Sequence, residues 1–407
     1  MSGIYIHIPF CKQACHYCDF HFSTSLKKRD ELVIALGKEL EMRKDEFKNT
    51  TVETIYFGGG TPSLLTIKEL DFLIQQVYVN YKVSEAPEIT IEANPDDLIH
   101  AQLSSRALTN SKYILNEGSL GTKSRGLTSN SIFSDYKSIG INRLSIGVQS
   151  FFETDLKLMN RAHNTEEAKS CLEEATRHFD NISIDLIYGI PGLTNEQWQQ
   201  NIEMALSYGI PHISSYALTV EPKTALESFI KKGIIDNVDD DLAHEQFHIL
   251  VETLEANDFV HYELSNFGKD GFFSRNNSAY WQGKPYLGIG PSAHSFSGNE
   301  RSWNIRNNSK YIAAIEAGTF PKETETLSTT DRYNEYVMTG LRTVWGVSLQ
   351  KVETNYGLPY KNYLLEHAQT FINQQLLYIE DEKLLVTKKG KFLCDGIASD
   401  LFMLNRS

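Results

Sequence analysis

The first twenty residues constrain this chain more than any other stretch. The run from Gly3 to Ile8 is rich in Ile and Tyr, which predicts a short buried strand, and it leads into Cys11, Cys15 and Cys18. Thiolates are soft ligands that suit iron-sulfur clusters and zinc, and a tight loop can turn three of them toward one centre. Three cysteine ligands leave one iron of a cubane cluster without a protein ligand.

A structural zinc site is the alternative, because either His7 or His16 would complete a set of three cysteines and one histidine. Such sites normally take pairs of ligands from two separated segments, and we expect no second pair downstream. The spacing therefore favours a cluster over zinc. Cys171 and Cys394 stand singly in segments of helical pattern, where a free cysteine is usually a small buried hydrophobe.

The composition limits the partners and the location. The 407 residues carry a formal net charge of -13 without a strong block of Lys or Arg, so we expect no nucleic-acid partner. No apolar run is long enough to cross a bilayer, and the N-terminus lacks the pattern of a signal peptide. We expect a cytoplasmic protein, and the reducing cytoplasm favours cysteines as thiolate ligands.

Strand-like and helix-like segments alternate through the first half of the chain. Buried strands are predicted at 54–57, 88–91, 143–148, 182–187 and 213–218, with helical periodicity between most of them, as in 165–179 and 195–208. Such alternation predicts parallel strands joined by crossover helices. Six units of this kind predict an α/β fold with a partial (β/α)6 barrel.

Several residues fall at or just past the carboxyl ends of these strands, the end that carries the active site in barrels of parallel strands. They are Cys11, Gly58 to Gly60, Glu92, Gln149, Tyr188 with Gly189, and Glu221. The glycines would let backbone amides approach a ligand closely, although a tight turn explains them equally well. Their coincidence at one rim predicts a binding site there.

The sequence predicts three regions. Residues 1–235 form the barrel, and within them residues 99–131 are predicted to be a largely disordered insertion, because they are long, polar and locally basic. Residues 236–320 extend the barrel and include an aromatic-rich segment, 274–296, that we expect to form an irregular pocket wall. Residues 321–407 contain helices followed by a strand hairpin, which predicts a small winged-helix-like domain.

Six motifs together resemble the radical S-adenosylmethionine (SAM) enzymes related to oxygen-independent coproporphyrinogen III oxidase. They are CKQACHYC at 11–18, GGGTPS at 58–63, EANPDD at 92–97, GVQSF at 147–151, IDLIYGIPG at 184–192 and GIGPSAHSF at 288–296. The resemblance covers nearly the whole chain except 99–131, and it identifies the predicted barrel with the radical SAM barrel. The true oxidases carry a further cysteine just after the third, whereas Asp19 and Phe20 here resemble the branch of HemW-type heme chaperones.

The resemblance implies two cofactors at this rim, an iron-sulfur cluster and S-adenosylmethionine. Cys11, Cys15 and Cys18 would hold a 4Fe-4S cluster, whose open iron would be chelated by S-adenosylmethionine. Gly59, Gly60 and Thr61 would contact the methionine amine of S-adenosylmethionine, and Glu92, Gln149 and Arg161 would contact its other polar groups. Asp185 would contact the ribose, and Tyr5 and Ala217 would line the pocket.

The resemblance also implies heme as a ligand and heme-acceptor proteins as partners, with peripheral membrane contact and a homodimer left open. The family's heme-binding signature is His-Asn-x-x-Tyr, and here Asn276 stands in the histidine position before Asn277 and Tyr280. The iron ligand is therefore open between Tyr280 and His294, or the heme is held by aromatic contacts. Two other functions remain as alternatives: an oxidase that decarboxylates coproporphyrinogen III, and a structural zinc protein.

Overall fold

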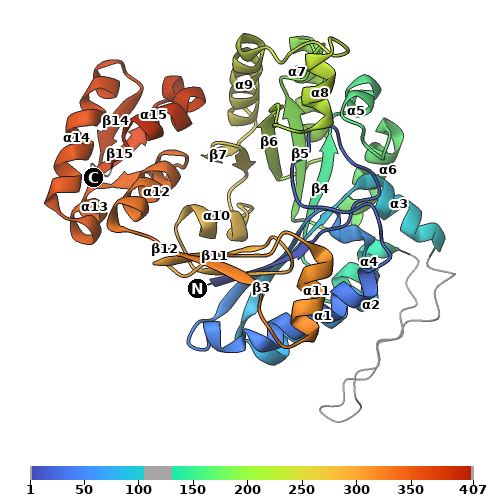
Figure 1. Ribbon diagram of the computed structural model, residues 1–407. Helices are drawn as coiled ribbons and strands as arrows, with labels where there is room; N and C mark the ends of the chain where they lie inside the picture. The colour runs from blue at the N-terminus through green and yellow to red at the C-terminus, as the bar shows by residue number, and fades with distance from the viewer. Residues whose placement is uncertain (1, 105–130, 405–407) are drawn as a thin grey trace.

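The computed structural model describes residues 2–104 and 131–404 as an α/β protein built on one large mixed sheet (Figure 1). Most of the predicted insertion, residues 105–130, lies outside the described residues. The start of that predicted insertion, residues 99–104, instead belongs to helix α3 (Pro95–Ser104). Among the described residues, no helix combines the length and the hydropathy that crossing a bilayer requires.

Six parallel strands follow one another in chain order at the centre of the sheet. They are β1 (Ser2–Ile8), β2 (Val52–Gly59), β3 (Val83–Ala93), β4 (Arg143–Gln149), β5 (Ile182–Tyr188) and β6 (His212–Ala217). On their outer sides, β1 pairs with β9 (Tyr286–Ile289) and β6 pairs with β8 (Asn266–Gly268), so the six strands form an open barrel. This arrangement confirms the predicted α/β fold with a partial (β/α)6 barrel.

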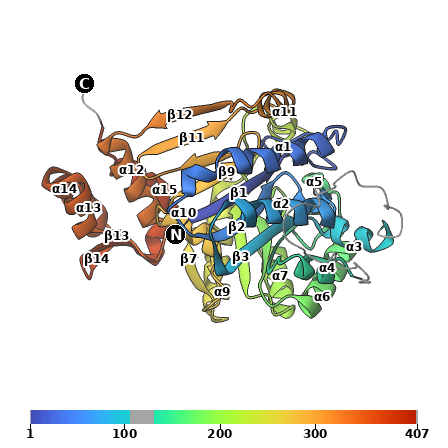
Figure 2. The same cartoon turned by 90° about the horizontal axis from the view of Figure 1, so that it is seen from below.

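The helices that connect these strands cover the outside of the barrel (Figures 1 and 2). They are α1 (Arg29–Met42), α2 (Ile67–Asn80), α3, α4 (Ile132–Ser138), α5 (Glu153–Leu158), α6 (Thr165–His178) and α7 (Asn195–Ser207), with short 3-10 turns η1 (Lys44–Phe47) and η2 (Pro62–Leu64). Local sequence sets their starts, since Thr66 begins α2 and Asn164 begins α6, each in a capping box. Their apolar faces pack on the sheet in one hydrophobic cluster.

The next region adds helices and lengthens the sheet at both edges. Helices α8 (Ala225–Lys231) and α9 (Asp240–Glu255) precede β7 (Val260–Glu263) and β8, which follow β6 in the sheet. The other edge gains β9, β10 (His294–Phe296), β11 (Glu300–Asn304) and β12 (Lys322–Thr326), with α11 (Asn308–Glu316) between the last two.

The expectation of an irregular segment at 274–296 is wrong, because this segment contains α10 (Arg275–Trp281), β9 and β10. The Ser274 side chain caps α10 by accepting a hydrogen bond from the Asn277 N–H (3.2 Å). Strand β9 lies between β1 and β10 and is almost wholly buried. With only four residues, one of them Gly288, this strand lacks the longer apolar run by which the other buried strands are recognised in sequence.

The C-terminal unit has its own small sheet and its own core. Helices α12 (Thr329–Leu341), α13 (Leu349–Tyr356), α14 (Leu358–Asn373) and α15 (Cys394–Asp400), with turn η3 (Lys388–Leu393), accompany the antiparallel strands β13 (Val347–Ser348), β15 (Lys383–Val386) and β14 (Leu377–Glu380). A second hydrophobic cluster extends from Tyr333 to Leu401. The predicted winged-helix-like fold is confirmed, and the boundaries between the three regions stay predictions.

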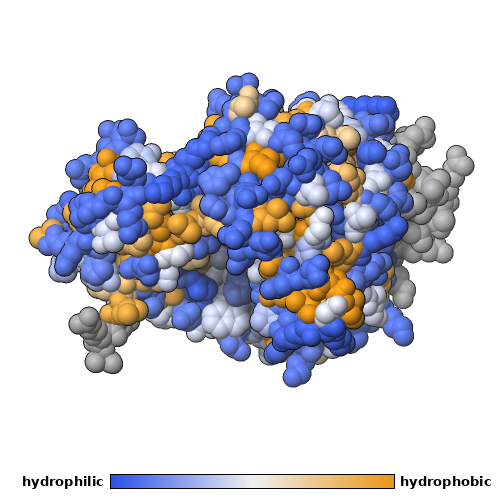
Figure 3. All heavy atoms as spheres, turned by 90° about the horizontal axis from the view of Figure 1, so that it is seen from above, coloured by the Kyte–Doolittle hydropathy of each residue, from blue (hydrophilic) through white to orange (hydrophobic). Residues whose placement is uncertain are grey.

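The face of the molecule seen from above is mainly hydrophilic (Figure 3). Figure 3 shows polar side chains over most of the face seen from above, with apolar side chains gathered in separate smaller patches. Most large apolar residues are instead packed in the two hydrophobic clusters. The burial of these residues supplies the main favourable term in folding.

A buried ionic network joins the first helix to the strands added late in the chain. One oxygen of Glu39 on α1 accepts hydrogen bonds from Arg43 Nη1 (3.1 Å) and Asn304 Nδ2 (2.9 Å). The other oxygen accepts from the Gly290 N–H (2.8 Å) and from the Tyr311 hydroxyl. The Glu39 and Arg43 side chains are almost completely buried. The network therefore holds α1 against the edge of the sheet that contains β9 and β11.

Glu39→Ala should lower the free energy of unfolding by roughly 3–5 kcal/mol, because it leaves four buried donors without their acceptor. Urea denaturation followed by circular dichroism measures the change. Glu31→Ala removes an exposed acid from the same helix and is the matched control, with an expected change within about 0.5 kcal/mol. An equal effect of the two substitutions would contradict a stabilising role for the network.

Candidate functional site

The cysteine loop follows β1 directly and is held against the segment after α5. The His16 N–H donates to the carbonyl of Met159 (3.0 Å), and Gln13 Nε2 donates to Asn160 Oδ1 (2.6 Å). These bonds fix the loop at both ends of its central turn. The free, half-buried thiols of this loop line one cavity; they belong to Cys11, Cys15 and Cys18.

The two histidines of the zinc alternative have other partners. The ring of His7 hydrogen-bonds to the Tyr5 hydroxyl through Nδ1 (3.1 Å) and to the His21 carbonyl through Nε2 (3.1 Å). His16 Nδ1 hydrogen-bonds to the carbonyl of Leu158 (2.8 Å). Within residues 2–104 and 131–404, no three His, Cys, Asp or Glu side chains are grouped as a single metal ion would require.

The glycine turn after β2 lies beside the cysteine loop. Parallel pairing places Gly59 opposite Ile8, and the Gly60 N–H donates to the Ile8 carbonyl (2.9 Å). Gly59 has a φ of 108°, which only glycine adopts readily. A Cβ atom on Gly60 would lie 2.6 Å from the carbonyl oxygen of Phe10. Gly58 and Gly59 end β2 and Gly60 follows it, and both Gly59 and Gly60 line the cavity beside the cysteines.

Two acids from β3 and β5 face this cavity. Glu92 accepts hydrogen bonds from the Tyr56 hydroxyl (2.9 Å) and the Gly59 N–H (3.1 Å). Burial raises the pKa of Glu92 to about 7, although the Tyr56 bond opposes the shift. Burial likewise raises the pKa of Asp185 to about 6, against the opposing charge of Arg143. Carboxyl groups perturbed in this way by burial are typical of functional sites.

Arg161 joins three parts of the site. Its Nη2 donates to Asn94 Oδ1 (2.7 Å) and to the Gly147 carbonyl (2.8 Å). Its Nη1 donates to Cys15 Sγ and to the Tyr17 hydroxyl, both at 3.4 Å. The Nε atom is buried and has no hydrogen-bond partner among the described residues. An unsatisfied buried donor on a cation indicates a place for an acceptor group of a ligand.

Gln149 ends β4 in a strained backbone conformation. Its φ is 69°, in the left-handed region that residues other than glycine seldom adopt, and its side chain is buried. A Cβ atom on Gly147 would lie 3.0 Å from Gln149 Nε2, so the amide folds back over this glycine. Strained residues of this kind cluster at ligand sites, which supports a binding role for Gln149.

These groups line one cavity of about 150 Å³ at the carboxyl ends of the parallel strands. From the residues predicted by sequence, its lining includes Cys11, Cys15, Cys18, Gly59, Gly60, Thr61, Glu92, Gln149, Arg161 and Asp185. Tyr5 and Ala217 are not among the lining residues. The Tyr5 ring stacks on Tyr56 inside the barrel with centroids 6.0 Å apart, and Ala217 is exposed at the end of β6.

The cavity lining also includes residues to which no role was predicted. Asn94 follows the end of β3, and Ser145 and Gly147 belong to β4. Ser145, Gly147 and Gln149 alternate along one face of that strand, so the two-residue period of a strand was a signal that could have found them. Asn94 lies within the EANPDD motif, and its side-chain oxygen accepts the hydrogen bond from Arg161 Nη2 described above.

Other positions of the predicted rim lie outside this cavity. Tyr188 ends β5, but its ring packs in the core against Trp198 (5.7 Å) and Phe247 (6.4 Å). Gly189 and Glu221 are not part of the cavity lining either. The small cavity lies at the predicted carboxyl ends of the strands, whereas the direction of the Tyr188 side chain depends on its packing against α7 and α9.

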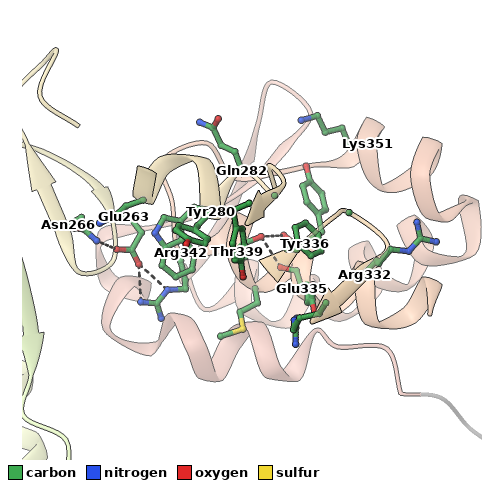
Figure 4. A pocket seen from close by; sticks show the side chains of 18 of the residues that line it. Glu263, Asn266, Tyr280, Gln282, Arg332, Glu335, Tyr336, Thr339, Arg342 and Lys351 are labelled. Atoms are coloured by element: carbon green, nitrogen blue, oxygen red, sulfur yellow. Dashed lines mark hydrogen bonds and ion pairs between the residues drawn. The ribbon is translucent and has the colours of Figure 1, made fainter. Parts of the chain in front are cut away.

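A second cavity, of about 870 Å³, lies between the barrel extension and the C-terminal unit (Figure 4). Asn277 and Tyr280 of the predicted heme motif both line it. Asn276 is instead buried, and its Oδ1 accepts a hydrogen bond from the Thr54 hydroxyl (3.0 Å). The other lining residues include the aromatic side chains of Tyr216, Trp281, Tyr286, Phe296, Tyr336 and Tyr356 and the charged side chains of Glu263, Arg301, Arg332, Glu335, Arg342 and Lys351.

The cations of this second cavity are of two kinds. Figure 4 shows Arg342 paired with Glu263 at one end, through Nε (3.0 Å) and Nη2 (2.9 Å). The Arg342 guanidinium also lies over the Trp281 ring, 4.9 Å from its centroid. Arg332 and Lys351, toward the other end, have no ion-pair partner among the described residues, and Arg332 donates hydrogen bonds to Asn299 Oδ1 (3.1 Å) and Thr329 Oγ1 (3.3 Å). The cavity therefore combines aromatic walls with cations, of which Arg332 and Lys351 carry no ion pair within the described part of the chain.

Comparisons with known proteins agree with this fold. The sequence model of the Radical SAM superfamily matches residues 5–205, and that of the HemN C-terminal domain matches residues 327–393. In structure, the chain is similar to coproporphyrinogen III oxidase (HemN) from Escherichia coli, with a TM-score of 0.79 over 99% of this chain and 90% of that chain. Their 21% sequence identity shows a shared fold and no more. The chain is a radical SAM protein.

Proteins with higher sequence identity to this chain show to which family of radical SAM proteins it belongs. The heme chaperone HemW of Bacillus subtilis (strain 168) is 32% identical over 397 residues, which cover 97% of each chain. The heme chaperone HemW of Lactococcus lactis subsp. lactis (strain IL1403) is 30% identical over 97% of this chain and 98% of that protein. The protein of the same name from Mycobacterium tuberculosis (strain H37Rv) is 29% identical over 98% and 94%. The chain belongs to the HemW family.

In protein without bound cofactors, Glu92→Gln should stabilise the fold more at pH 8 than at pH 5. The folded pKa of Glu92, about 7, is raised above the ordinary value of 4.5, so the parent loses stability as the pH rises between these values. Glutamine stays uncharged and avoids roughly 2–3 kcal/mol of this loss in the free energy of unfolding. Urea denaturation at both pH values measures the difference.

Glu85→Gln is the matched control, because Glu85 is an exposed acid on the same strand. The control should show little change between the two pH values. A difference between Glu92→Gln and the parent that does not depend on pH would contradict the raised pKa.

Proposed function

We propose that this chain is a heme chaperone, which binds heme and transfers it to acceptor proteins, and that it retains sites for an iron-sulfur cluster and S-adenosylmethionine. The observation that carries the proposal is the presence of two cavities of different chemistry in one chain. One is small and contains three cysteines, and the other is large, aromatic and cationic. The similarity to heme chaperones of the HemW family supports heme as the cargo. A cytoplasmic location is part of the proposal.

The residues of the small cavity fit a 4Fe-4S cluster with S-adenosylmethionine. Three half-buried free thiols and one unsatisfied buried guanidinium donor are the groups that such a pair of ligands needs. When bound, the cluster supplies an electron to the sulfonium of S-adenosylmethionine. We assign Cys11, Cys15 and Cys18 to the cluster. For S-adenosylmethionine, we assign Gly59, Gly60 and Thr61 to the amine, and Glu92, Gln149 and Arg161 to its other polar groups. Asp185 is assigned to the ribose, and Tyr5 and Ala217 are assigned to the surrounding wall.

The chain's own part in the small cavity is to bind and orient. Both Nη atoms of Arg161 are engaged by protein groups, so its unpartnered Nε is the donor that remains for a carboxylate of the ligand. Burial raises the pKa of Glu92 to about 7, so a positively charged group of the ligand nearby would stabilise the ionised carboxylate. A side chain on Gly60 would collide with the Phe10 carbonyl oxygen. Glycine is therefore needed where this segment passes the cysteine loop.

The large cavity suits a flat aromatic ring with carboxylate arms. Heme has such a ring and two propionate groups. Tyr280, Trp281 and Tyr286 offer aromatic faces and edges for the macrocycle. Arg332 and Lys351 have no ion-pair partner among the described residues and would meet the propionates. This match between cavity and ligand supports heme binding at the interface with the C-terminal unit.

Tyrosine and methionine are the iron ligands that this cavity offers. Proteins ligate heme iron mainly through His, Cys, Met or Tyr, and the lining holds Tyr280, Tyr286 and Met338 among residues of these types. His294 is exposed on β10 and is not part of the lining. Asn276 is engaged with Thr54 in the interior. We therefore assign the first candidate ligand to Tyr280, whose ring packs 4.2 Å from that of Tyr286.

Oxidation of coproporphyrinogen III is the alternative function, since the chain shares its fold with an oxidase of that substrate. Asp19 and Phe20 stand where the resemblance places a further cysteine in that branch. Phe20 lines the small cavity and is 67% exposed, so it supplies no thiol there. This observation favours the chaperone over the oxidase.

Anaerobic reconstitution should load about four irons per chain, as a cubane cluster requires. Replacing any one of Cys11, Cys15 or Cys18 with Ala should abolish loading, because each supplies one of the three protein ligands. Cys171→Ala is the matched control, since that thiol is buried in α6 outside the cavity lining. Iron and sulfide analysis measures the loading, and stoichiometric zinc without iron would favour the zinc alternative.

Heme titration followed by the Soret band should give roughly tenfold weaker binding for Trp281→Ala and for Arg332→Gln, because each change removes about 1–2 kcal/mol of contact. Tyr280→Phe should shift the Soret maximum, because the phenol oxygen is lost as a ligand. His294→Ala is the control and should behave as the parent does.

Unchanged affinity and spectra in the three cavity variants, or a loss in His294→Ala alone, would assign heme to another site. A parallel assay for protoporphyrinogen formation separates the two functions. Sustained turnover in the presence of S-adenosylmethionine and a reductant would favour the oxidase, whereas heme release to an acceptor without turnover would favour the chaperone.

A further inference from the structure

Two histidines on α9 face each other outside both cavities. His244 and His248 are one helical turn apart, and their Nε2 atoms lie 2.9 Å from each other. His244 is exposed and His248 is half-buried. Neither residue lines the small or the large cavity. The expectation that no second pair of ligands follows the cysteine loop is therefore wrong.

Packing holds both rings in this orientation. Phe392 of η3 packs against the ring of His244 with centroids 4.6 Å apart. Phe247 lies edge-on to His248 at 6.0 Å, and it is itself buried in the core beneath the helix. A pair of rings held in place by their neighbours loses little conformational freedom when it binds an ion.

Only one proton can lie between the two nitrogens. A neutral imidazole donates through one ring nitrogen and accepts through the other, so one Nε2 carries the hydrogen and the other accepts it. Burial lowers the pKa of His248, and the neighbouring His244 lowers it further, so a doubly protonated pair is disfavoured. If both rings carry their proton on Nδ1, two lone pairs converge on one point, where a cation is favoured.

We infer that His244 and His248 together bind a borderline divalent metal ion of the class of Zn²⁺, Ni²⁺ and Cu²⁺. Imidazole nitrogens suit these ions, and a His-x-x-x-His pair on a helix presents both donors to the same ion. In the described part of the chain no third His, Cys, Asp or Glu joins the pair, so water occupies the remaining coordination positions. Glu252 lies near enough to favour a cation here, whereas Lys388 opposes it.

The test uses untagged full-length protein and NiCl₂ as the probe. In isothermal titration the parent should bind one more equivalent of Ni²⁺ than the double variant H244A/H248A, and the difference isolates these histidines from the cysteine thiols. Glu252→Gln should bind this ion more weakly, because a nearby negative charge is lost. His367→Ala removes an exposed histidine from α14 and should match the parent.

Equal Ni²⁺ binding by the parent and by H244A/H248A would overturn the inference, as would an equal loss in His367→Ala. The double variant should keep the circular dichroism spectrum of the parent, because both substitutions lie on the surface of one helix. It should also keep the heme titration of the parent, so the outcome here is independent of the proposed heme function.

Discussion

The parallel pairing of β1 with β2 is the constraint on which the site depends. Ile8 lies opposite Gly59, so the chain leaves both strands at the same edge of the sheet, with the cysteine loop after one and the glycine turn after the other. The Gly60 N–H bond to the Ile8 carbonyl joins the two exits. A shift of one residue would turn the buried side chains of β1 to the opposite face. The core thus sets where the cysteines and the glycines meet.

The charged groups near this end of the strands are costly to bury, and their mutual attraction offsets only part of the cost of removing them from water. Glu92 and Asp185 have raised pKa values because of burial, and the charge of Arg143 opposes the shift of Asp185. Arg143 is itself 1% exposed, and two of its nitrogens have no hydrogen-bond partner among the described residues. Apolar residues of similar size would often be as stable or more stable here. The arrangement is therefore better explained by a ligand than by stability.

The large cavity depends on how the C-terminal unit docks. The Leu264 N–H donates to the Arg342 carbonyl (2.9 Å), and the Val344 N–H donates to the Tyr262 carbonyl (3.1 Å). Arg342 adds ion pairs to Glu263 and, on its own unit, to Asp395. These contacts hold α12 as one wall of the cavity, opposite α10. A ligand bound there would contact both units, because residues of both line the cavity.

The sequence alone determined the cysteine loop, the six parallel strands and the edge at which the site lies, because these follow from local patterns of apolar residues and strand ends. The sequence could not reveal β9, a strand of four residues that includes Gly288, and it could not show that Tyr188 turns into the core while Arg161 turns toward the cysteines. Contacts between distant segments decide these directions. The large cavity was likewise decided by tertiary structure, since docking of the C-terminal unit forms it. The four-residue spacing of His244 and His248 is local and stands in the sequence, whereas the packing of Phe392 on the His244 ring depends on the tertiary structure.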